Sequence, residues 1–343
     1  MKSNNNINLL TNSFAFTMKY RVLYIIKKTP RRNIWQMENE QDNKEQELSL
    51  ENQLLTANSE SLELDIIRKH SGSHYVEPEF VELYSFSEKQ IQKYCEWVKE
   101  QYTAIVKTWD VEKNTFWTAK YYLATKFLYM TNLLAESLDY SKENNLKITI
   151  PYLIYYSLLT ASRSLIYTSP IDNLPLDEKR THENIINVTA DIIAKISKDE
   201  SNAYKDTINT AKENRELYSY KFPASGLSLI NDNSDKVSKQ IKLIKELAIL
   251  NSQILDVKLN KIKDKSVFEI DGTCNSVFYN LFEFNDKLDN DDYYNSGYIA
   301  RKIKRPQPLN FMISEGIEED LSFPWEPEEE IDGVFVPPLY IFN

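Results

Sequence analysis

Residues 151–170 read PYLIYYSLLTASRSLIYTSP, and this stretch decides the fold. Apolar and small side chains occupy nearly all of it, and Arg163 is its only charged residue. Proline suits the first turn of a helix, where its missing N–H is not needed, so Pro151 marks a helix start. A helix that is apolar almost all round is typically buried. The sequence therefore predicts a helix over Tyr152–Tyr167 at the centre of a helical bundle.

The segments on both sides of this stretch also have the periodicity of helices. Apolar residues recur there at spacings of three and four, as they do on one face of an α-helix. The pattern predicts further helices over about 87–105, 115–139, 181–197, 202–220 and 234–262. Residues 68–78 contain Gly72 and Pro78 and are predicted to form a loop. The expected fold is mainly α, with a helical bundle over residues 64–265.

Glycine is rare in this chain, with six in 343 residues. Tight hairpins and phosphate-binding loops both use glycine for positive φ angles. The sequence contains no GxGxxG or Walker-type motif, so we expect no nucleotide cofactor. The two cysteines, Cys95 and Cys274, form no CxxC motif, and we expect both to be free thiols. Three histidines are too few for a histidine-rich site, so we expect no metal and no cofactor.

Charge is unevenly distributed along the chain. Residues 1–36 carry seven Lys or Arg and no acid, whereas the whole chain has a net charge of −10. This basic leader is interpreted as an organellar transit peptide or, preferably, as an extension before a start at Met37, and residues 1–63 are expected to be disordered or extended. The acidic remainder is expected to bind nucleic acid only locally. No stretch is apolar and long enough to span a membrane, and we expect a cytoplasmic protein.

The character of the sequence changes after residue 265. Residues 266–343 hold four of the six glycines and short β-compatible runs at 266–270 and 334–336. They are predicted to form an irregular, partly β appendage. A basic cluster within them is interpreted as a phosphate contact or as a solvated loop, and its members are Arg301, Lys302, Lys304 and Arg305. Acidic and aromatic residues are combined at 322–343, and this combination suits docking into a partner's groove.

Three segments of the chain resemble one family of helical-bundle domains. Residues 155–170 read YYSLLTASRSLIYTSP, residues 181–196 read THENIINVTADIIAKI, and residues 215–223 read RELYSYKFP. This ordered set of Tyr-Tyr, Ala-x-Arg, a proline loop, Thr-His and a later Arg resembles the HEPN superfamily. The match covers about residues 119–220, and the run over 121–137 is similar to the YaaC-like branch of that superfamily.

The HEPN resemblance implies two functions of different kinds. Many HEPN-like domains are metal-independent endoribonucleases that use an Arg and a His four to six residues apart at a dimer interface. In this sequence that spacing occurs only from Arg68 to His74, outside the matching helices. The favoured expectation is therefore a non-catalytic interaction module, with a protein partner or a second copy, in an intracellular assembly such as a stress or anti-phage system. The alternative is a ribonuclease that acts on RNA.

The candidate site residues follow from the resemblance and from the chemistry of their side chains. In a ribonuclease, a histidine can move the 2′-hydroxyl proton and an arginine can stabilise the charged phosphorane. The residues assigned to these roles are Arg163, His182 and Arg215. The side chains expected to line the cleft are Tyr156, Tyr218 and Tyr220.

The three catalytic candidates also have structural interpretations. His182 could bond to loop backbone as a polar residue in the first turn of a helix. Arg163 on an apolar helix needs a partner, and the acids considered for it are Asp191, Glu213 and Glu216. Arg215 could end a helix and pack against the following turn. The interpretations differ in geometry, because catalysis requires the three side chains to converge on one cleft.

Overall fold

The computed structural model describes residues 66–71, 80–171, 181–226, 234–270, 283–284 and 287–312, together with residues 317, 321 and 324. All of them belong to one compact unit, Leu64–Asn343. The predicted leader over 1–63, the run over 334–336, the docking tail at 322–343 apart from residue 324, and Cys274 lie outside the described residues. Cys95 is buried on α4.

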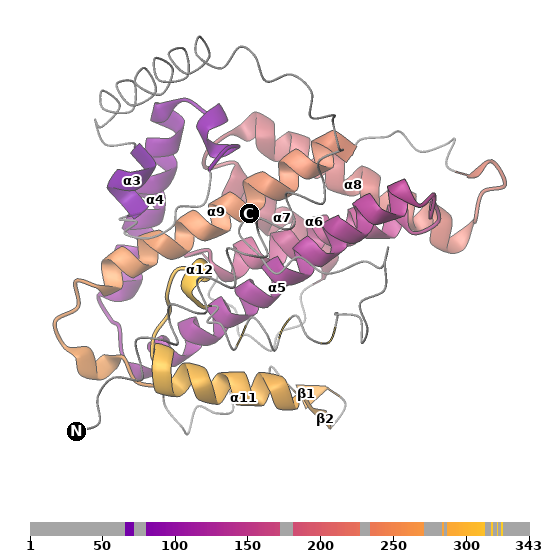
Figure 1. Ribbon diagram of the computed structural model, residues 1–343. Helices are drawn as coiled ribbons and strands as arrows, with labels where there is room; N and C mark the ends of the chain where they lie inside the picture. The colour runs from indigo at the N-terminus through magenta and orange to yellow at the C-terminus, as the bar shows by residue number, and fades with distance from the viewer. Residues whose placement is uncertain are drawn as a thin grey trace, which may run out of the picture. The chain divides into compact units, whose positions relative to one another are not determined.

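Helices make up most of the described chain, so the fold is mainly α (Figure 1). The α-helices, in chain order, are α3 (Ile66–Ser71), α4 (Glu88–Val106), α5 (Val111–Glu143), α6 (Ile150–Tyr167), α7 (His182–Ile193), α8 (Lys198–Tyr220), α9 (Ser234–Leu259), α11 (Asn290–Tyr298) and α12 (Leu309–Met312). Shorter helical turns are η1 (Leu83–Ser85), η3 (Lys265–Val267) and the π-helix η5 (Ile299–Ile303). Among the described residues, β pairing is limited to the two-residue strands β1 (Glu283–Phe284) and β2 (Lys287–Leu288), which are antiparallel.

Short polar side chains fix the starts of the long helices. Ser87 and Gln90 form a reciprocal capping box at the start of α4. The Asp110 carboxylate accepts from the N–H of Lys113 at 2.8 Å, at the start of α5. Thr181 caps α7 in the same way. Because each cap satisfies a backbone N–H that has no partner inside the helix, these positions set the helix boundaries.

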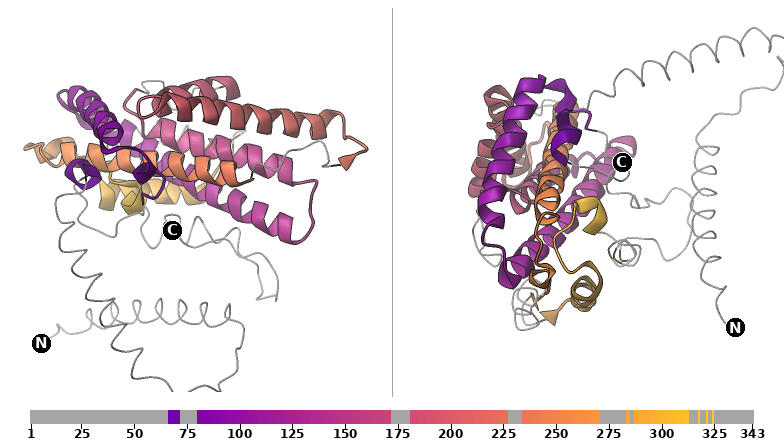
Figure 2. Two further views of the ribbon diagram at one scale, coloured as in Figure 1. Left: turned by 90° about the horizontal axis from the view of Figure 1, so that it is seen from above. Right: turned by 90° about the vertical axis from the view of Figure 1, so that its left-hand side faces the viewer.

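The helix α6 lies at the centre of the bundle, as the sequence predicts. It packs against α5, α7, α8 and α9. Figure 2 shows α7 and α8 on one side of α6 and α5 on the other. Pro151 occupies its first turn, and most of its side chains from Tyr155 to Ile166 are buried.

Tyrosine is prominent in the core. The largest fully buried side chains include six tyrosines, which are Tyr94, Tyr102, Tyr121, Tyr122, Tyr155 and Tyr204. The hydroxyl of each of these six tyrosines has a hydrogen-bond partner, for example Asn251 at 2.9 Å from Tyr94 and Ser162 at 2.7 Å from Tyr204. Burying a hydroxyl without a partner is unfavourable, so these contacts are what allows tyrosine to fill the core.

The segment before α4 differs from the prediction. Residues 68–71 belong to α3 and are not a loop, because Ile67 is buried and α3 packs on α4 and α9.

The run over 266–270 is not a strand, since η3 occupies its start, where Asp264 accepts from the N–H of Ser266.

The region after residue 265 is also more helical than predicted and shares the main core. Its contributions to that core include Phe268, Ile299, Ile303, Leu309 and Met312. The described part of this region is therefore packed against the bundle.

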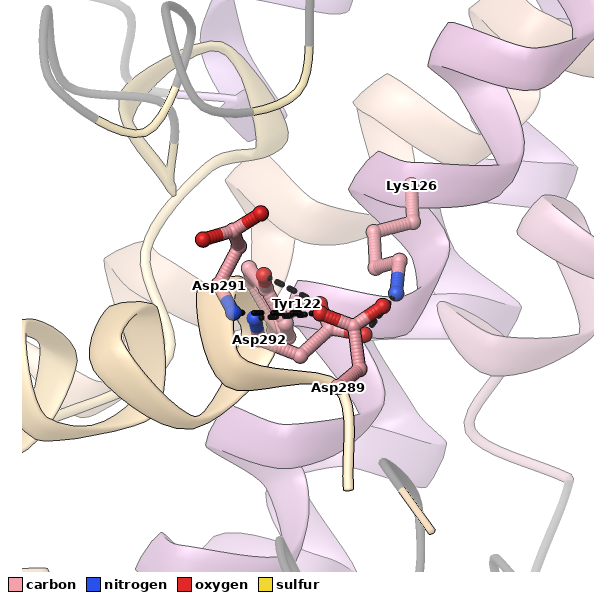
Figure 3. A network of polar contacts seen from close by, with 5 residues as sticks. All are labelled: Tyr122, Lys126, Asp289, Asp291 and Asp292. Atoms are coloured by element: carbon pink, nitrogen blue, oxygen red, sulfur yellow. Dashed lines mark hydrogen bonds and ion pairs between the residues drawn. The ribbon is translucent and has the colours of Figure 1, made fainter. Parts of the chain in front are cut away.

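The helix α11 is attached to α5 by a polar network (Figure 3). Tyr122 donates its hydroxyl proton to Asp292 Oδ1 at 2.7 Å, and Lys126 forms an ion pair with the same carboxylate. Asp289 accepts from the N–H groups of Asp291 and Asp292 and so begins α11. Asp292 is buried, with 7% of its side chain exposed. This short polar helix therefore keeps its place through one buried carboxylate.

A second buried carboxylate joins α9 to η1. Glu246 accepts from the N–H of Glu82 at 3.0 Å and from that of Leu83 at 2.7 Å. Burial raises the pKa of Glu246 from 4.5 to about 7, although the two backbone N–H groups act in the opposite direction. The folded state therefore holds this proton up to a higher pH than the unfolded state does.

Glu246→Gln is expected to remove a pH dependence of stability. The raised pKa of Glu246 stabilises the folded state fully below pH 4.5, and this stabilisation is lost as the pH rises through about 7. Relative to Glu246→Gln, the wild-type free energy of unfolding should fall by about 2 kcal/mol across that range. Urea unfolding at several pH values measures this, with the exposed Glu100→Gln as control. Parallel curves for wild type and Glu246→Gln would contradict the assignment.

Candidate functional site

Tyr155 and His182 form the centre of the candidate site. Tyr155 is fully buried on α6, and its hydroxyl lies 2.8 Å from His182 Nδ1. The Thr181 cap makes His182 the first residue of α7, which directs the imidazole toward α6. His182 itself is half-buried, and its Nε2 makes no hydrogen bond to the described residues. The imidazole is therefore oriented through one nitrogen while the other is left for a ligand.

Two arginines stand beside this pair. The Arg215 guanidinium carbon, from α8, lies 5.1 Å from the centre of the Tyr155 ring. Arg215 also forms an ion pair with Glu216 at 3.1 Å, which neutralises part of its charge. Arg163, from α6, lies 5.3 Å from the centre of the Phe127 ring on α5. His182 and Arg215 therefore both contact Tyr155, whereas Arg163, about two turns further along α6, contacts Phe127.

The ion pair expected for Arg163 is absent among the described residues. None of the three acids considered for it, Asp191, Glu213 and Glu216, contacts its guanidinium, and Glu216 is taken by Arg215. The Phe127 ring provides a cation–π contact instead, which partly offsets the loss of water around the charge. Because no acid neutralises it there, Arg163 keeps a full positive charge near the site.

The positive charges change the acidity of the imidazole. Burial lowers the pKa of His182, and the charges of Arg163, Arg215 and Lys212 lower it further. Burial raises the pKa of Tyr155, and the Arg215 charge only partly opposes this. At neutral pH the site therefore contains a neutral imidazole and a protonated phenol, surrounded by cations. This arrangement suits an anionic ligand with a proton that a neutral imidazole can accept.

Arg163→Gln is expected to raise the pKa of His182 toward its ordinary value of 6.5, because it removes the larger of the two arginine contributions. Lys205→Gln, about two turns before Lys212 on α8, is the control and should leave the pKa nearly unchanged, because Lys205 is not among the charges that act on His182. Titration of the histidine ring protons by NMR measures both. An unchanged pKa in Arg163→Gln would show that the guanidinium lies too far from the imidazole to act on it.

A shallow polar groove lies next to the site, between α7 and α8. Its volume is about 220 Å³, and its lining residues are Glu183, Ile186, Asn187, Lys205, Asn209 and Lys212. Lys212 connects the groove to the site, since its charge also lowers the pKa of His182. Two lysines and two asparagines in the lining provide hydrogen-bond donors for an anionic or polar ligand.

The tyrosines predicted to line a cleft have different positions. Tyr156 is half-buried and packs edge-on against Tyr155, with ring centres 5.2 Å apart, so it belongs to the site. Tyr218 is buried, with 6% exposed, and does not line an open cleft. Tyr220 is 80% exposed at the end of α8. Ser219 beside it donates to the Tyr152 hydroxyl at 3.3 Å, which ties this helix end to α6.

Sequence reasoning did not assign Tyr155, Phe127 or Lys212 to the site. Tyr155 was visible only as half of a Tyr-Tyr pair, and its contact with His182 depends on the packing of α6 against α7. Lys212 carried a signal, because it lies three residues before Arg215 and shares its helix face.

The four residues of the predicted basic cluster differ in their contacts and exposure. Arg301, Lys302 and Lys304 are exposed at η5 and just after it. Arg305 instead forms an ion pair with Asp256 at 2.9 Å and donates to Asn260 at 3.0 Å. Three of the four cations are therefore available to an external phosphate.

No family model, no curated protein and no solved structure matches this chain. Within the described residues, no three His, Cys, Asp or Glu side chains are grouped so that they could hold a metal ion. None of the helices in the described part is long and apolar enough to cross a membrane.

Proposed function

We propose that this chain is a HEPN-like helical bundle that cleaves RNA with the side chains of α6, α7 and α8. The observation that carries the proposal is the convergence of His182, Arg215 and Arg163 around Tyr155. These residues come from three helices and do not have the usual sequence spacing of the superfamily. The contacts of His182 and Arg215 with Tyr155, and the effect of the Arg163 charge on His182, support a catalytic cluster.

The chemistry requires a base, a means of stabilising negative charge and a bound phosphodiester. His182 Nε2 accepts the proton of the RNA 2′-hydroxyl, and the 2′-oxygen attacks the adjacent phosphorus. The bond from phosphorus to the 5′-oxygen breaks, and a proton from solvent neutralises the leaving oxygen. Arg163 and Arg215 stabilise the negative charge on the phosphorane. The products are a 2′,3′-cyclic phosphate and a 5′-hydroxyl.

Tyr155 has a positioning role in this scheme. In the tautomer that can accept the proton at Nε2, the Nδ1–H of His182 donates to the Tyr155 hydroxyl oxygen, and this contact fixes the direction of Nε2. The Arg215 guanidinium packs on the same ring, so one buried side chain orients both groups.

The test is incubation of the purified full chain with end-labelled single-stranded RNA in the presence of EDTA. The proposal expects fragments that end in a 2′,3′-cyclic phosphate. The same RNA with 2′-O-methyl groups should remain intact, because it has no 2′-hydroxyl to deprotonate. No cleavage of either RNA, by a protein with an intact fold, would contradict the proposal.

A non-catalytic interaction module is the second candidate, and one observation favours it. Large apolar side chains are exposed where α5 turns into α6 and where α8 ends, namely Leu146, Ile148, Tyr220 and Phe222. Their exposed fractions run from 45% for Leu146 to 80% for Tyr220. A surface of this kind is suited to a protein partner or a second copy in an intracellular assembly, such as a stress or anti-phage system. A concentration-dependent dimer that Tyr220→Ser with Phe222→Ser abolishes, together with no RNA cleavage, would favour this candidate.

A further inference from the structure

Polar contacts at one end of the bundle join the last turn of α9, the first turn of α5, the segment after η3 and the segment after η5. Arg305 contacts both Asp256 and Asn260, which attaches the segment after η5 to the last turn of α9. Asn114, in the first turn of α5, donates to the Lys304 carbonyl at 2.7 Å and to the Glu269 carbonyl at 2.9 Å. In Figure 1 the C-terminal end of α9 and the N-terminal end of α5 lie together at the lower left, beside the end of the α11 helix.

The end of α4 belongs to the same region. Lys258 on α9 donates to Thr103 Oγ1 on α4 at 2.5 Å. Burial lowers the pKa of Lys258, and the positive charges of Lys99 and Lys261 lower it further. Cations from two helices are therefore close enough to repel one another here.

This end of the bundle carries a concentration of exposed positive charge. We call it the basic end, and its members are Lys261, Lys263, Lys265, Arg301, Lys302 and Lys304. Of the nearby acids, Asp256 is paired with Arg305, whereas Asp264 is exposed, accepts from Ser266 and offsets one positive charge. Glu269 is exposed nearby and offsets one charge. A basic surface is unexpected in a chain with a net charge of −10.

Favourable interactions with helix dipoles explain the positions of only some of these cations. Cations near a helix C-terminus are favourable because the last carbonyl groups there are partly negative. Lys258 already lies in the last turn of α9, and Arg301 and Lys302 lie in the last turn of η5. Lys265 lies in the single turn of η3, whereas Lys261 and Lys263 come after Leu259, where α9 has ended, and belong to no helix. The dipole effect falls off within one turn, so Lys263 needs another explanation.

We propose that the basic end binds the phosphodiester backbone of a nucleic acid strand. Regularly repeated phosphates are the ligand that matches several exposed lysines and arginines on one surface. An anionic membrane surface is disfavoured, because none of the large hydrophobic side chains that are exposed in the described residues lies between 256 and 270 or between 299 and 305.

The basic end goes beyond the proposed cleavage site and does not depend on it. Asn114 and Phe127 lie on the same helix, 13 residues apart by number. At 1.5 Å per residue this separates the basic end from the Tyr155 region by roughly 20 Å along α5. If both surfaces contact one strand, the basic end holds a part of it that is distant from the scissile bond.

The experiment measures binding of the full chain to a fluorescent 2′-O-methyl RNA strand by anisotropy, over a range of salt concentrations. This strand cannot be cleaved through a 2′-hydroxyl, so the result is independent of the proposed ribonuclease activity. The test variant combines Lys261→Glu, Lys263→Glu and Lys302→Glu. The matched control combines Lys236→Glu, Lys239→Glu and Lys242→Glu, which are three exposed lysines in the first half of α9. Both variants are first checked for an unchanged helical signal and melting temperature.

The expected result is a loss of affinity of roughly tenfold or more in the test variant, with little loss in the control. The slope of log K against log salt should also become shallower by about 2, since each phosphate contact to a single strand contributes about 0.7. Equal losses in both variants would overturn the proposal, because they would reflect net charge alone. Binding to phosphatidylserine vesicles that depends on the same lysines, without binding to the strand, would also overturn it.

Discussion

His182→Ala is expected to lower the rate of RNA cleavage by about 10²- to 10⁴-fold, the usual contribution of a general base. Nε2 is the nitrogen with no partner among the described residues, and Nδ1 is held by the Tyr155 hydroxyl. The alanine removes the base, while the two arginines keep their contacts with Phe127 and Tyr155. RNA binding should therefore change much less than the cleavage rate.

The matched control for this prediction is His70→Ala, because His70 lies on α3 and is the other described histidine. Cleavage by that variant should be unchanged. Tyr155→Phe provides a further test, since it keeps the ring under Arg215 but removes the hydroxyl that holds the imidazole. It should slow cleavage by less than His182→Ala does and should change the pKa of His182 in an NMR titration. Full activity of His182→Ala would contradict the assignment of the base.

The pH dependence of cleavage has a defined direction. A general base must be neutral, so the activity should be lost as the pH falls through the pKa of His182. Burial and the neighbouring cations lower that pKa below 6.5. The rate should therefore already be at its plateau at neutral pH and should fall only in more acidic solution. A rate that kept rising between pH 7 and 9 would indicate a different base.

Asp292→Ala is expected to lower the free energy of unfolding by about 3 kcal/mol. The substitution leaves the Tyr122 hydroxyl buried without its acceptor and removes the partner of the Lys126 ammonium group (Figure 3). Breaking a buried charge pair from one side typically costs about 3–5 kcal/mol. The Lys126 side chain is 30% exposed, so water partly replaces the lost contact and the lower value applies.

Urea unfolding of Asp292→Ala compared with Asp291→Ala measures this effect. Asp291 is the adjacent acid in the same helix turn, and its residue is exposed. It takes part in the network only through its backbone N–H, which the alanine variant retains. Asp291→Ala should therefore change the stability by less than about 0.5 kcal/mol. Equal losses in the two variants would show that net charge, and not the buried contact, holds α11.

Most of the helices before residue 265 were predictable from sequence because each combines a cap with an apolar face. The predicted starts near residues 87 and 181 agree with the caps Ser87 of α4 and Thr181 of α7. The sequence predicts the start of α5 at Thr115, four residues after the observed start at Val111, because three of the four residues Val111–Asn114 are polar and the apolar periodicity begins only after them.

The helix α11 could not be predicted from periodicity. Its sequence, NDDYYNSGY, has no apolar stripe, and it is held through Asp292 by partners about 170 residues earlier in the chain. The helix α3 was missed for a related reason, because Ile67 is buried only by packing against α4 and α9. In both cases tertiary contacts decide a structure that local preference leaves open.

The membership of the candidate site stays a prediction, and its contacts could not be derived from the sequence. The three residues came from the resemblance, whereas Tyr155 as their common neighbour required knowledge of how α6 packs on α7 and α8. Arg163 was expected to find an acid and contacts Phe127 instead. An aromatic partner on another helix cannot be read from the spacing of charges.

The hydroxyl contacts inside the bundle restrict how its helices can align. Tyr94 with Asn251, Tyr204 with Ser162 and Tyr155 with His182 each join a different pair of helices. Sliding one helix past another by a single turn, about 5.4 Å, would leave these oxygens facing hydrocarbon. A core of leucines alone tolerates several such alignments at similar energy. In this protein the directional bonds of tyrosine select one alignment, so the bundle has a single register.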